Sequence, residues 1–160
     1  MSELSRSASR IAEELARLGV DAQVVELPDS TRTALEAAQA IGCEVGQIVK
    51  SLVFRMPAED RPVLVLASGA DRVDEDRLAA LLGGEVEQAS GRFVRERTGF
   101  AIGGVPPFGH DERLVTYLDE HLLSFEVVWA AGGTPRAVFP IAPAELVRAS
   151  DATVVSVAVR

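Results

Sequence analysis

Two apolar segments around a short polar turn constrain the fold of this chain more than any other feature. Residues 47–55 and 62–68 are rich in valine and leucine, and residues 56–61 between them are mostly polar or turn-forming. Apolar runs of this length on either side of such a turn are typical of an antiparallel β-hairpin. Both faces of the first run are largely apolar, which predicts a strand in the interior of a sheet.

The remaining elements are predicted from capping residues, glycine stops and hydrophobic periodicity. We expect helices at residues 5–18, 33–41, 74–82, 91–98 and 143–149, a helical turn at 119–123, and strands at 20–27, 85–88, 114–118, 126–131, 136–141 and 153–159. Residues 132–135 form the turn of a second hairpin. Two hairpins argue against a sheet of parallel strands alone, because adjacent parallel strands need a long crossover connection. The predicted fold is therefore α/β, with a strongly curved, mixed, mostly antiparallel and barrel-like sheet and helices packed outside.

The composition fits a single globular domain that spans residues 1–160. Of the 160 residues, 48% are hydrophobic, which is enough for a substantial core. The sequence has no apolar run long enough to cross a membrane, and its first residues lack the apolar centre of a signal peptide. One cysteine and two histidines are too few for a structural zinc site. We expect a cytoplasmic protein without a metal or another cofactor.

The net charge of −8 argues against a general binder of DNA or RNA, because phosphate neutralisation needs clustered cations. It leaves open a contact with one small part of a nucleic acid. Residues 88–110 are locally positive, with three arginines and one acid. A solvated helix face is the simpler interpretation of these arginines, and the acidic run at residues 71–76 is also interpreted as solvated.

Lys50 is the only lysine in the chain, against fifteen arginines, and it lies inside the apolar run of residues 47–55. Period-two alternation places Lys50 on the same face as Leu52 and Phe54. A charge at such a position is costly unless another group pairs with it. Lys50 is either a cation that holds a carbonyl or phosphate oxygen in a pocket, or a nucleophile with a lowered pKa. The alternative is a structural lysine that snorkels to solvent or pairs with a buried carboxylate.

Residues 99–110 contain four glycines and two prolines. Glycine lets the backbone approach a ligand closely, and proline fixes φ and removes an amide donor. We interpret the stretch as a rigid binding wall that faces Lys50 across a pocket, with a tight structural connection as the alternative. His110 is followed by Asp111 and Glu112, so a surface histidine is a simpler interpretation than a general acid or base.

Other residues give weaker indications of chemistry. Gly132, Gly133 and Thr134 could direct backbone amides at an oxyanion or phosphate, although a plain hairpin turn is the commoner role. Cys43 has no neighbouring histidine and is interpreted as an inert thiol. The sequence has no Walker loop, dinucleotide-binding fingerprint or serine-hydrolase elbow, and no conventional catalytic triad can be assembled from it.

Three of these segments together resemble the YbaK/prolyl-tRNA-synthetase-associated domain family, whose members are trans-editing aminoacyl-tRNA deacylases. The matching segments are residues 47–54, 99–110 and 128–135, and in order and spacing the resemblance covers about residues 8–149. It implies hydrolysis of the ester that joins a wrong amino acid to the 3′-terminal ribose of a tRNA. It also implies that water and a ribose hydroxyl of the substrate carry the reaction, without a protein nucleophile.

The resemblance also implies roles for particular residues. Lys50 corresponds to the family's essential lysine, which holds the substrate near the scissile ester, and Ser51 occupies a polar, variable position beside it. The other substrate-binding residues that it implies are Thr31, Gly103, Gly104, Val105, Pro106, His110, Gly132, Gly133 and Thr134. Residues 103–106 would form one wall of the pocket, and residues 132–134 would form the opposite lip.

The substrate implied by this resemblance is a small amino acid such as alanine, serine or cysteine, on tRNA-Pro or a related tRNA. The pocket would lie between the alanine-rich helix at residues 33–41, Lys50 and the Gly103-Gly104 pair. The acidic net charge implies contacts limited to the 3′ acceptor end, or delivery of the substrate by an aminoacyl-tRNA synthetase or an elongation factor. Two alternatives remain. One is a non-catalytic module of the same fold that binds an aminoacyl-nucleotide or a protein, and the other is an enzyme that forms a Schiff base through Lys50.

Overall fold

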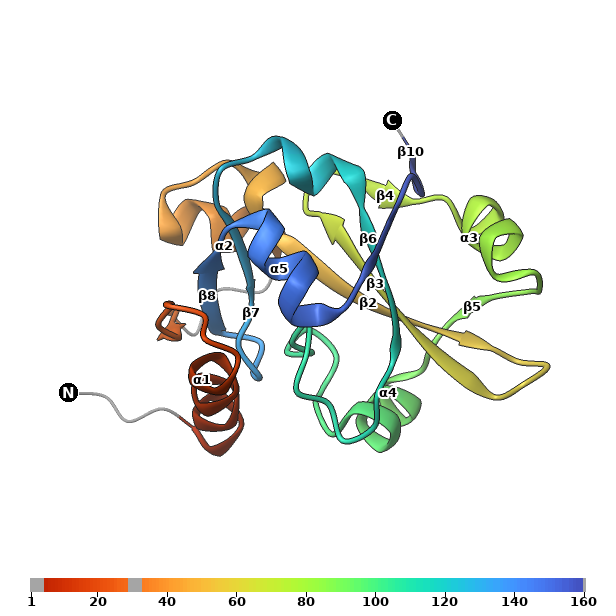
Figure 1. Cartoon of the computed structure of the whole chain (residues 1–160), viewed down its shortest axis with the longest axis horizontal. Coiled ribbons are helices and arrows are strands. Elements are labelled where there is room, and N and C mark those ends of the chain that lie inside the picture. The colour runs from red at the N-terminus through yellow and green to blue at the C-terminus, as the bar shows by residue number, and fades with distance from the viewer. Residues whose placement is uncertain (1–4, 29–32, 160) are drawn as a thin grey trace.

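The computed structural model describes residues 5–28 and 33–159, which form a mixed α/β structure (Figure 1). In chain order the elements are α1 (Arg6–Arg17), β1 (Val25–Glu26), α2 (Ala34–Ile41), the 3-10 helix η1 (Val45–Gln47), β2 (Val49–Met56), β3 (Arg61–Ser68), β4 (Arg72–Val73), α3 (Glu75–Leu82), β5 (Glu87–Gln88), α4 (Gly91–Thr98), β6 (Val115–Asp119), the 3-10 helix η2 (Glu120–Ser124), β7 (Val128–Ala131), β8 (Ala137–Ile141), α5 (Pro143–Ser150), β9 (Thr153–Val155) and β10 (Ala158–Val159). Each helix predicted from the sequence is present with nearly the expected bounds.

A five-stranded sheet lies at the centre, in the order β5-β2-β3-β6-β9. β2 and β3 are antiparallel along their full length, from Val49 opposite Ser68 to Met56 opposite Arg61, whereas β3, β6 and β9 run parallel to one another. A three-stranded antiparallel sheet has the order β1-β8-β7, and β10 pairs with β4. Both predicted hairpins and the mixed character of the sheet are therefore confirmed.

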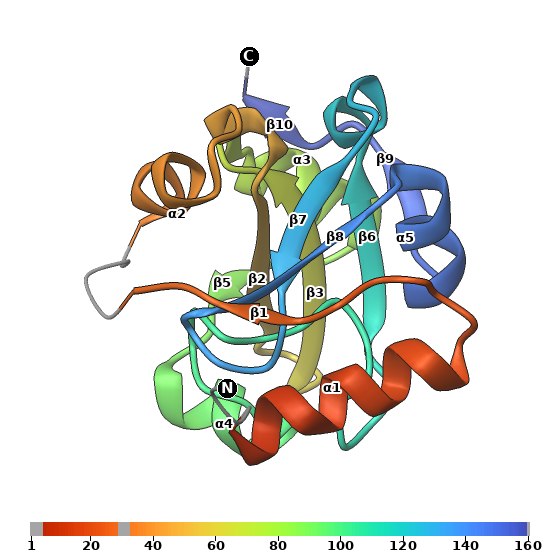
Figure 2. The same ribbon diagram turned by 90° about the vertical axis from the view of Figure 1, so that its left-hand side faces the viewer.

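The central and three-stranded sheets meet at the start of β2. Ile48 forms a parallel bridge with Trp129 of β7. Figure 2 shows β7 and β8 crossing in front of β2 and β3, with α1 below them and α5 to one side. The chain thus curves from one sheet into the next around a shared interior.

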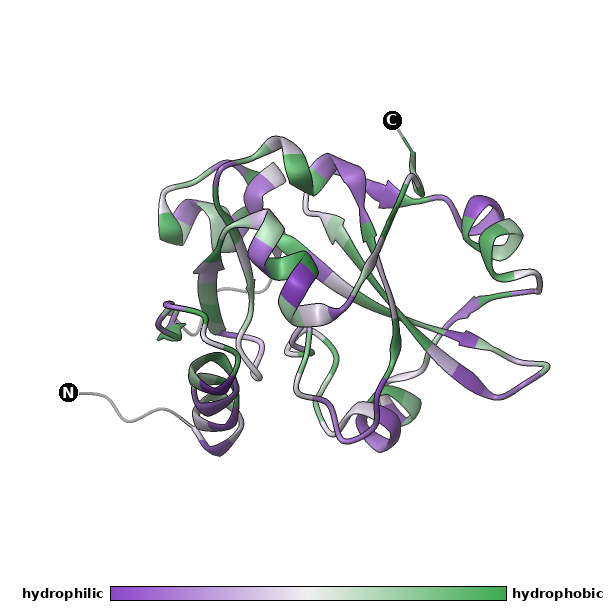
Figure 3. Cartoon of the chain, viewed as in Figure 1, coloured by the Kyte–Doolittle hydropathy of each residue, from purple (hydrophilic) through white to green (hydrophobic). Residues whose placement is uncertain are grey.

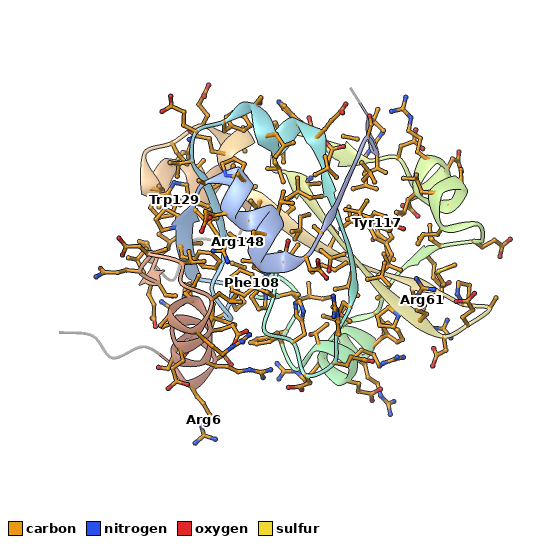
Figure 4. The ribbon with its side chains drawn as sticks, viewed as in Figure 1. Arg6, Arg61, Phe108, Tyr117, Trp129 and Arg148 are labelled. Carbon is orange, nitrogen blue, oxygen red and sulfur yellow. The ribbon has the colours of Figure 1, made fainter. Side chains whose placement is uncertain are left out.

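Hydrophobic side chains pack on both faces of the central sheet. On one face, Leu64 and Leu66 of β3 lie in a core with residues of α1, α5 and the β7–β8 hairpin. Phe108, labelled in Figure 4, belongs to this core, and its ring centre lies 5.8 Å from that of Phe139 in β8. On the other face, Val63 and Val65 pack with α3 and the last strands. Figure 3 shows the hydrophobic residues concentrated in the strands, while α1 and α4 carry hydrophilic residues outward.

The helix ends follow local signals in the sequence. The Thr33 hydroxyl accepts a hydrogen bond from the Glu36 N–H at 3.1 Å, so Thr33 caps α2 as expected. The predicted capping box is only half formed, because the Glu36 carboxylate accepts from the Thr33 hydroxyl at 3.1 Å and not from its backbone N–H. The side chains of Asp74 and Ser90 likewise accept from backbone N–H groups in the first turns of α3 and α4. Gly99 ends α4 with a left-handed φ of +84°. Of the helices in the described residues, none has the length and apolar character needed to span a membrane.

The strand predictions differ from the structure at the two ends of the chain. The strand expected at residues 20–27 is reduced to Val25–Glu26. The strand expected at residues 153–159 is split into β9 and β10. Its interruption has a clear cause, because the fully buried Asp119 carboxylate accepts hydrogen bonds from the backbone of Val157 (2.9 Å) and Ala158 (3.1 Å). The chain therefore leaves β6 at this point and pairs with β4 instead.

Candidate active site

A cavity of about 670 Å³ opens beside β2, within the range of small-molecule sites in proteins. Its walls come from β2, the segment from β4 into α3, β5, α4, the segment after α4 and β10. The lining residues are Lys50, Ser51, Leu52, Val53, Phe54, Arg72, Val73, Asp74, Glu75, Asp76, Gln88, Ala89, Val94, Ile102, Gly103, Val105 and Val159.

The cavity exists because the outer edge of β2 has strand partners only at its two ends. At one end, β7 reaches this strand through the bridge at Ile48. At the other end, β5 pairs only with Phe54 and Arg55. Between these points none of the described strands covers the outer edge, so Lys50 and Ser51 border open space. The topology of the sheet therefore creates the site.

Lys50 is half-buried at the end of the cavity next to β4. Its Nζ donates a hydrogen bond to the backbone carbonyl of Asp71. Burial lowers the pKa of the Lys50 amine, and the negative charge of Asp71 acts in the opposite direction. An ammonium group has three N–H donors, so a lysine that gives one to the protein can offer others to a ligand oxygen.

Asp71 and His121 form a contact that the sequence interpretation missed. His121 Nδ1 lies 2.6 Å from Asp71 Oδ2, and the Asp71 side chain is only 8% exposed. The interpretation of residues 71–76 as a solvated acidic run is therefore wrong for Asp71. The register of the β2–β3 hairpin could have indicated that Asp71 lies near Lys50. Val49 pairs with Ser68, so the turn that follows Ser68 must lie close to Lys50.

Ser51 contributes an unusual polar group to the same edge. Its hydroxyl oxygen is buried and has no hydrogen-bond partner within the described parts of the chain. A buried polar group left unpaired costs about 1–3 kcal/mol. Since Ser51 also lines the cavity, this hydroxyl is a candidate for contact with a ligand.

The segment after α4 supplies two of the four residues predicted for the wall of the pocket. Gly103 and Val105 line the cavity together with Lys50, and Gly103 has a φ of +87°. Gly104 turns away from the cavity and lies against the β7–β8 turn. A Cβ on Gly104 would be 2.7 Å from the carbonyl carbon of Thr134. Only glycine fits this close approach, which holds the wall in place.

The β7–β8 turn lies behind this wall and does not line the cavity. The Gly132 N–H donates to the Ala137 carbonyl at 2.7 Å, and the Thr134 hydroxyl accepts from the Ala137 N–H at 3.1 Å. A Cβ on Gly133 would lie 2.6 Å from a backbone carbonyl of α1. The structure thus places Thr134 against Gly104 and Gly133 against α1, and the contact of Gly132, Gly133 and Thr134 with a substrate stays a prediction.

His110 and Pro106 contact each other away from the cavity lining. His110 Nε2 lies 2.6 Å from the Pro106 carbonyl oxygen, and the imidazole lies edge-on to Phe100 with the ring centres 6.3 Å apart. Burial lowers the pKa of His110, and the Pro106 carbonyl acts in the opposite direction. Thr31 lies outside the described residues. The alanine-rich α2 also contributes nothing to the lining, since it packs with Ile48 in a separate core.

The described residues contain no cluster of three or more histidine, cysteine or acidic side chains that could hold a metal ion. The cavity instead combines two cations, Lys50 and Arg72, with the backbone of Gly103 and the Ser51 hydroxyl, which has no partner among the described residues. These groups can bind and polarise an oxygen atom of a ligand, while the positioning of the reacting atoms comes from the rigid walls.

Comparison with known proteins connects this site to a family. The model of the aminoacyl-tRNA editing domain matches residues 28–149. The chain is 36% identical over 125 residues to YwhH of Bacillus subtilis, an uncharacterised protein, which covers 77% of this chain and 78% of YwhH. It is 33% identical over 111 residues to the proline–tRNA ligase of Limosilactobacillus fermentum, with 66% of this chain covered. In that ligase the match spans only 19% of the length.

A solved structure agrees with the family model. The chain is 53% identical, with a TM-score of 0.94, to a protein described as a candidate trans-editing enzyme for prolyl-tRNA synthetase. The match covers 99% of this chain and 100% of that one. The family model includes Lys50, Ser51 and the whole segment after α4, so all the residues that line the cavity except Val159 are part of the match. The chain belongs to the aminoacyl-tRNA editing domain family.

Proposed function

We propose that the protein is a trans-editing aminoacyl-tRNA deacylase. It would hydrolyse the ester between a wrongly attached small amino acid, such as alanine, serine or cysteine, and the 3′-terminal ribose of tRNA-Pro or a related tRNA. The observation that carries the proposal is the half-buried Lys50 in a cavity walled by Gly103 and Val105, in a chain of the aminoacyl-tRNA editing family. The similarity to a candidate trans-editing enzyme supports the choice of tRNA.

Lys50 would act by holding charge rather than by forming a bond. Water adds to the ester carbonyl carbon, the bond from that carbon to the ribose oxygen breaks, and the ribose oxygen takes up a proton. Negative charge develops on the carbonyl oxygen during the attack, and an ammonium N–H of Lys50 stabilises it in a site of restricted solvent access. A hydroxyl of the substrate ribose would orient the water, so the reaction needs no protein nucleophile.

A size-selective role would explain why a separate editing site is needed. One methylene group changes binding by only about 1–3 kcal/mol, so a synthetase cannot fully reject a slightly smaller amino acid in its own pocket. A second site that admits only the small amino acid removes the error. Gly103 has no side chain, and Val105 is rigid and buried, so the wall opposite Lys50 has a fixed position.

The charge of the protein restricts how it meets a tRNA. With a net charge of −8, the chain cannot hold a long stretch of phosphates. We infer that it contacts only the 3′ acceptor end, in the cytoplasm where tRNAs are charged, or that a synthetase or elongation factor delivers the substrate.

A panel of mischarged tRNAs tests the function. The native protein, Lys50→Ala and a matched control, Arg17→Ala, are each incubated with tRNA-Pro charged with alanine, serine or cysteine, and loss of the amino acid is followed. Arg17 is a suitable control because it is an exposed cation on α1, paired with Glu14 and remote from the cavity. We expect release by the native protein and the control, and none by Lys50→Ala. Release that persists in Lys50→Ala would overturn the mechanism, and binding without release by the native protein would favour a non-catalytic module.

A further inference from the structure

The contact between His121 and Asp71 lies directly behind Lys50. The His121 imidazole contacts the Asp71 carboxylate, while the backbone carbonyl of Asp71 accepts a hydrogen bond from Lys50 Nζ. His121 therefore reaches the lysine through a single intervening residue. Neither Asp71 nor His121 has a part in the function proposed above.

The turn that carries Asp71 is hydrogen-bonded to the segment that leads into β2. The Gly69 N–H donates to the Ile48 carbonyl at 2.6 Å. The buried Ser68 hydroxyl donates to the Gly46 carbonyl at 2.7 Å. Because these bonds tie the turn to the strand that bears the lysine, the Asp71 carbonyl keeps a defined position beside the ammonium group.

His121 is also held from its own side. Its backbone N–H donates to the buried Asp119 carboxylate at 3.1 Å, and its ring centre lies 5.4 Å from that of Phe125. Phe125 in turn packs so closely on Gly46 that a Cβ there would lie 2.7 Å from the ring. The imidazole therefore approaches Asp71 from a fixed place, and its side chain remains 30% exposed.

Asp71 is the carboxylate whose charge acts on the lysine. Its negative charge raises the pKa of Lys50 against the lowering effect of burial. The other charged residues that line the cavity are Arg72, Asp74, Glu75 and Asp76. The lining residues from β5, α4 and the segment after α4 are uncharged. Asp71 is thus joined to Lys50 by both a hydrogen bond and an electrostatic attraction.

We propose that Asp71 and His121 are positioning residues for Lys50. His121 holds the Asp71 carboxylate in place, the Asp71 carbonyl accepts one N–H of the lysine, and the carboxylate favours the charged ammonium. The remaining N–H groups then face the cavity. Their use in deacylation rests on the proposed function, whereas the effect on Lys50 itself does not.

The single lysine makes this proposal directly measurable. Acetic anhydride acylates only the neutral form of an amine, so the extent of labelling of the Lys50 peptide against pH, read by mass spectrometry, reports the protonation of this side chain. In Asp71→Asn the charge that raises the pKa of Lys50 is lost, so we expect the labelling profile to move to lower pH. A movement of one pH unit corresponds to about tenfold faster labelling at a fixed pH. In His121→Phe, which keeps a ring against Phe125, we expect a smaller movement in the same direction.

Glu126→Gln is the matched control, because Glu126 is an exposed carboxylate just beyond η2. Its profile should match that of the native protein, and an equal movement in this control would overturn the proposal. Unchanged profiles in both test variants would also overturn it. If Asp71→Asn does not fold, His121→Phe decides, since a movement to lower pH supports the proposal and an unchanged profile overturns it.

The same variants extend the test to catalysis. On mischarged tRNA, a positioning role predicts that kcat falls while KM changes little, because the charge that stabilises the reacting oxygen is displaced. A rise in KM with unchanged kcat would contradict that role. If the native protein releases no amino acid, the proposed function fails, and the labelling experiment still decides whether Asp71 and His121 control Lys50.

Discussion

The edge of β2 and the β7–β8 turn both carry polar groups but use them in opposite ways. At the edge of β2, the Ser51 hydroxyl has no partner in the described chain, and the charge of Lys50 is half-buried. At the β7–β8 turn, Gly132 and Thr134 form hydrogen bonds within the hairpin. The comparison teaches that one region keeps polar groups available for a ligand, while the other uses them to stabilise the fold.

This difference gives a rule that can be tested. Changes at the edge of β2 should reduce function while leaving the fold as stable or more stable. Changes at the supporting turn and its neighbours should reduce stability while the folded molecules keep their function. A variant that behaves in the opposite way would break the comparison.

The largest effect is expected for Lys50→Met. Loss of a donor that stabilises a developing oxyanion lowers the rate by about 10²–10³-fold. Burial lowers the pKa of Lys50, so the charged form of the amine is disfavoured in the folded protein. The buried charge therefore destabilises the fold wherever the pH is below the pKa of Lys50 in the folded protein. Removing the charge should therefore raise the free energy of unfolding at neutral pH. Single-turnover deacylation and urea unfolding measure the two effects, and a less stable variant would contradict the rule.

Gly104→Ala should give the largest effect on the supporting side. The new Cβ would meet the Thr134 backbone at 2.7 Å, and overpacking of this kind costs about 1–3 kcal/mol. Gly91→Ala is the control, because its Cβ would meet only the Ile102 side chain at an ordinary 3.7 Å. Urea unfolding of both variants checks the difference. Equal stability of the two would show that the close contact with the turn does not hold the wall.

Ser51→Ala should have a smaller effect of opposite sign on stability. Removing a buried hydroxyl without a partner should stabilise the fold by about 1 kcal/mol. If the ligand uses this hydroxyl, the release of the amino acid should fall by up to about tenfold, the value of one neutral hydrogen bond. A destabilised variant would mean that the hydroxyl belongs to the supporting region.

His110→Gln should show the smallest effect. Burial lowers the pKa of His110, so the unfolded chain takes up a proton at a higher pH than the folded protein does. The native protein should then lose stability as the pH falls through about 6.5, and this part of the loss should be absent from the variant. Unfolding curves of both proteins above and below that pH give the comparison. A large loss of deacylation in the folded variant would instead move His110 to the functional side.

Much of the fold follows from signals between neighbouring residues. Thr33 and Ser90 cap their helices through groups three residues away, which the sequence displays directly. The register of the β2–β3 hairpin follows from a short turn and two apolar runs. These interactions are local, so their free energy depends little on the rest of the chain. The prediction that residues 103–106 share a pocket with Lys50 also rests on motifs, and the cavity lining matches it for Gly103 and Val105 but not for Gly104 and Pro106.

The remaining features depend on residues that are distant in the sequence. Asp71 lies in a run of acidic residues that is typical of a solvated surface. Its contact with His121, which is 50 positions away in the sequence, forms only in the folded protein. The buried Asp119 likewise interrupts the last strand through two amides nearly forty positions away. Such pairs leave no periodic pattern, because a single carboxylate can accept hydrogen bonds wherever the chain returns. The placement of the β7–β8 turn behind the wall has the same origin.

The hydrogen bonds from the Val157 and Ala158 amides to the Asp119 carboxylate have a practical consequence for handling the protein. They fix β10 against β4, and Val159 at the end of β10 lines the cavity. Figure 1 shows α1, the first helix of the chain, far from β10 on the other side of the molecule. An affinity tag or fluorescent fusion at the C-terminal end would therefore crowd the mouth of the cavity. The same tag placed ahead of α1 would leave the approach to the cavity open.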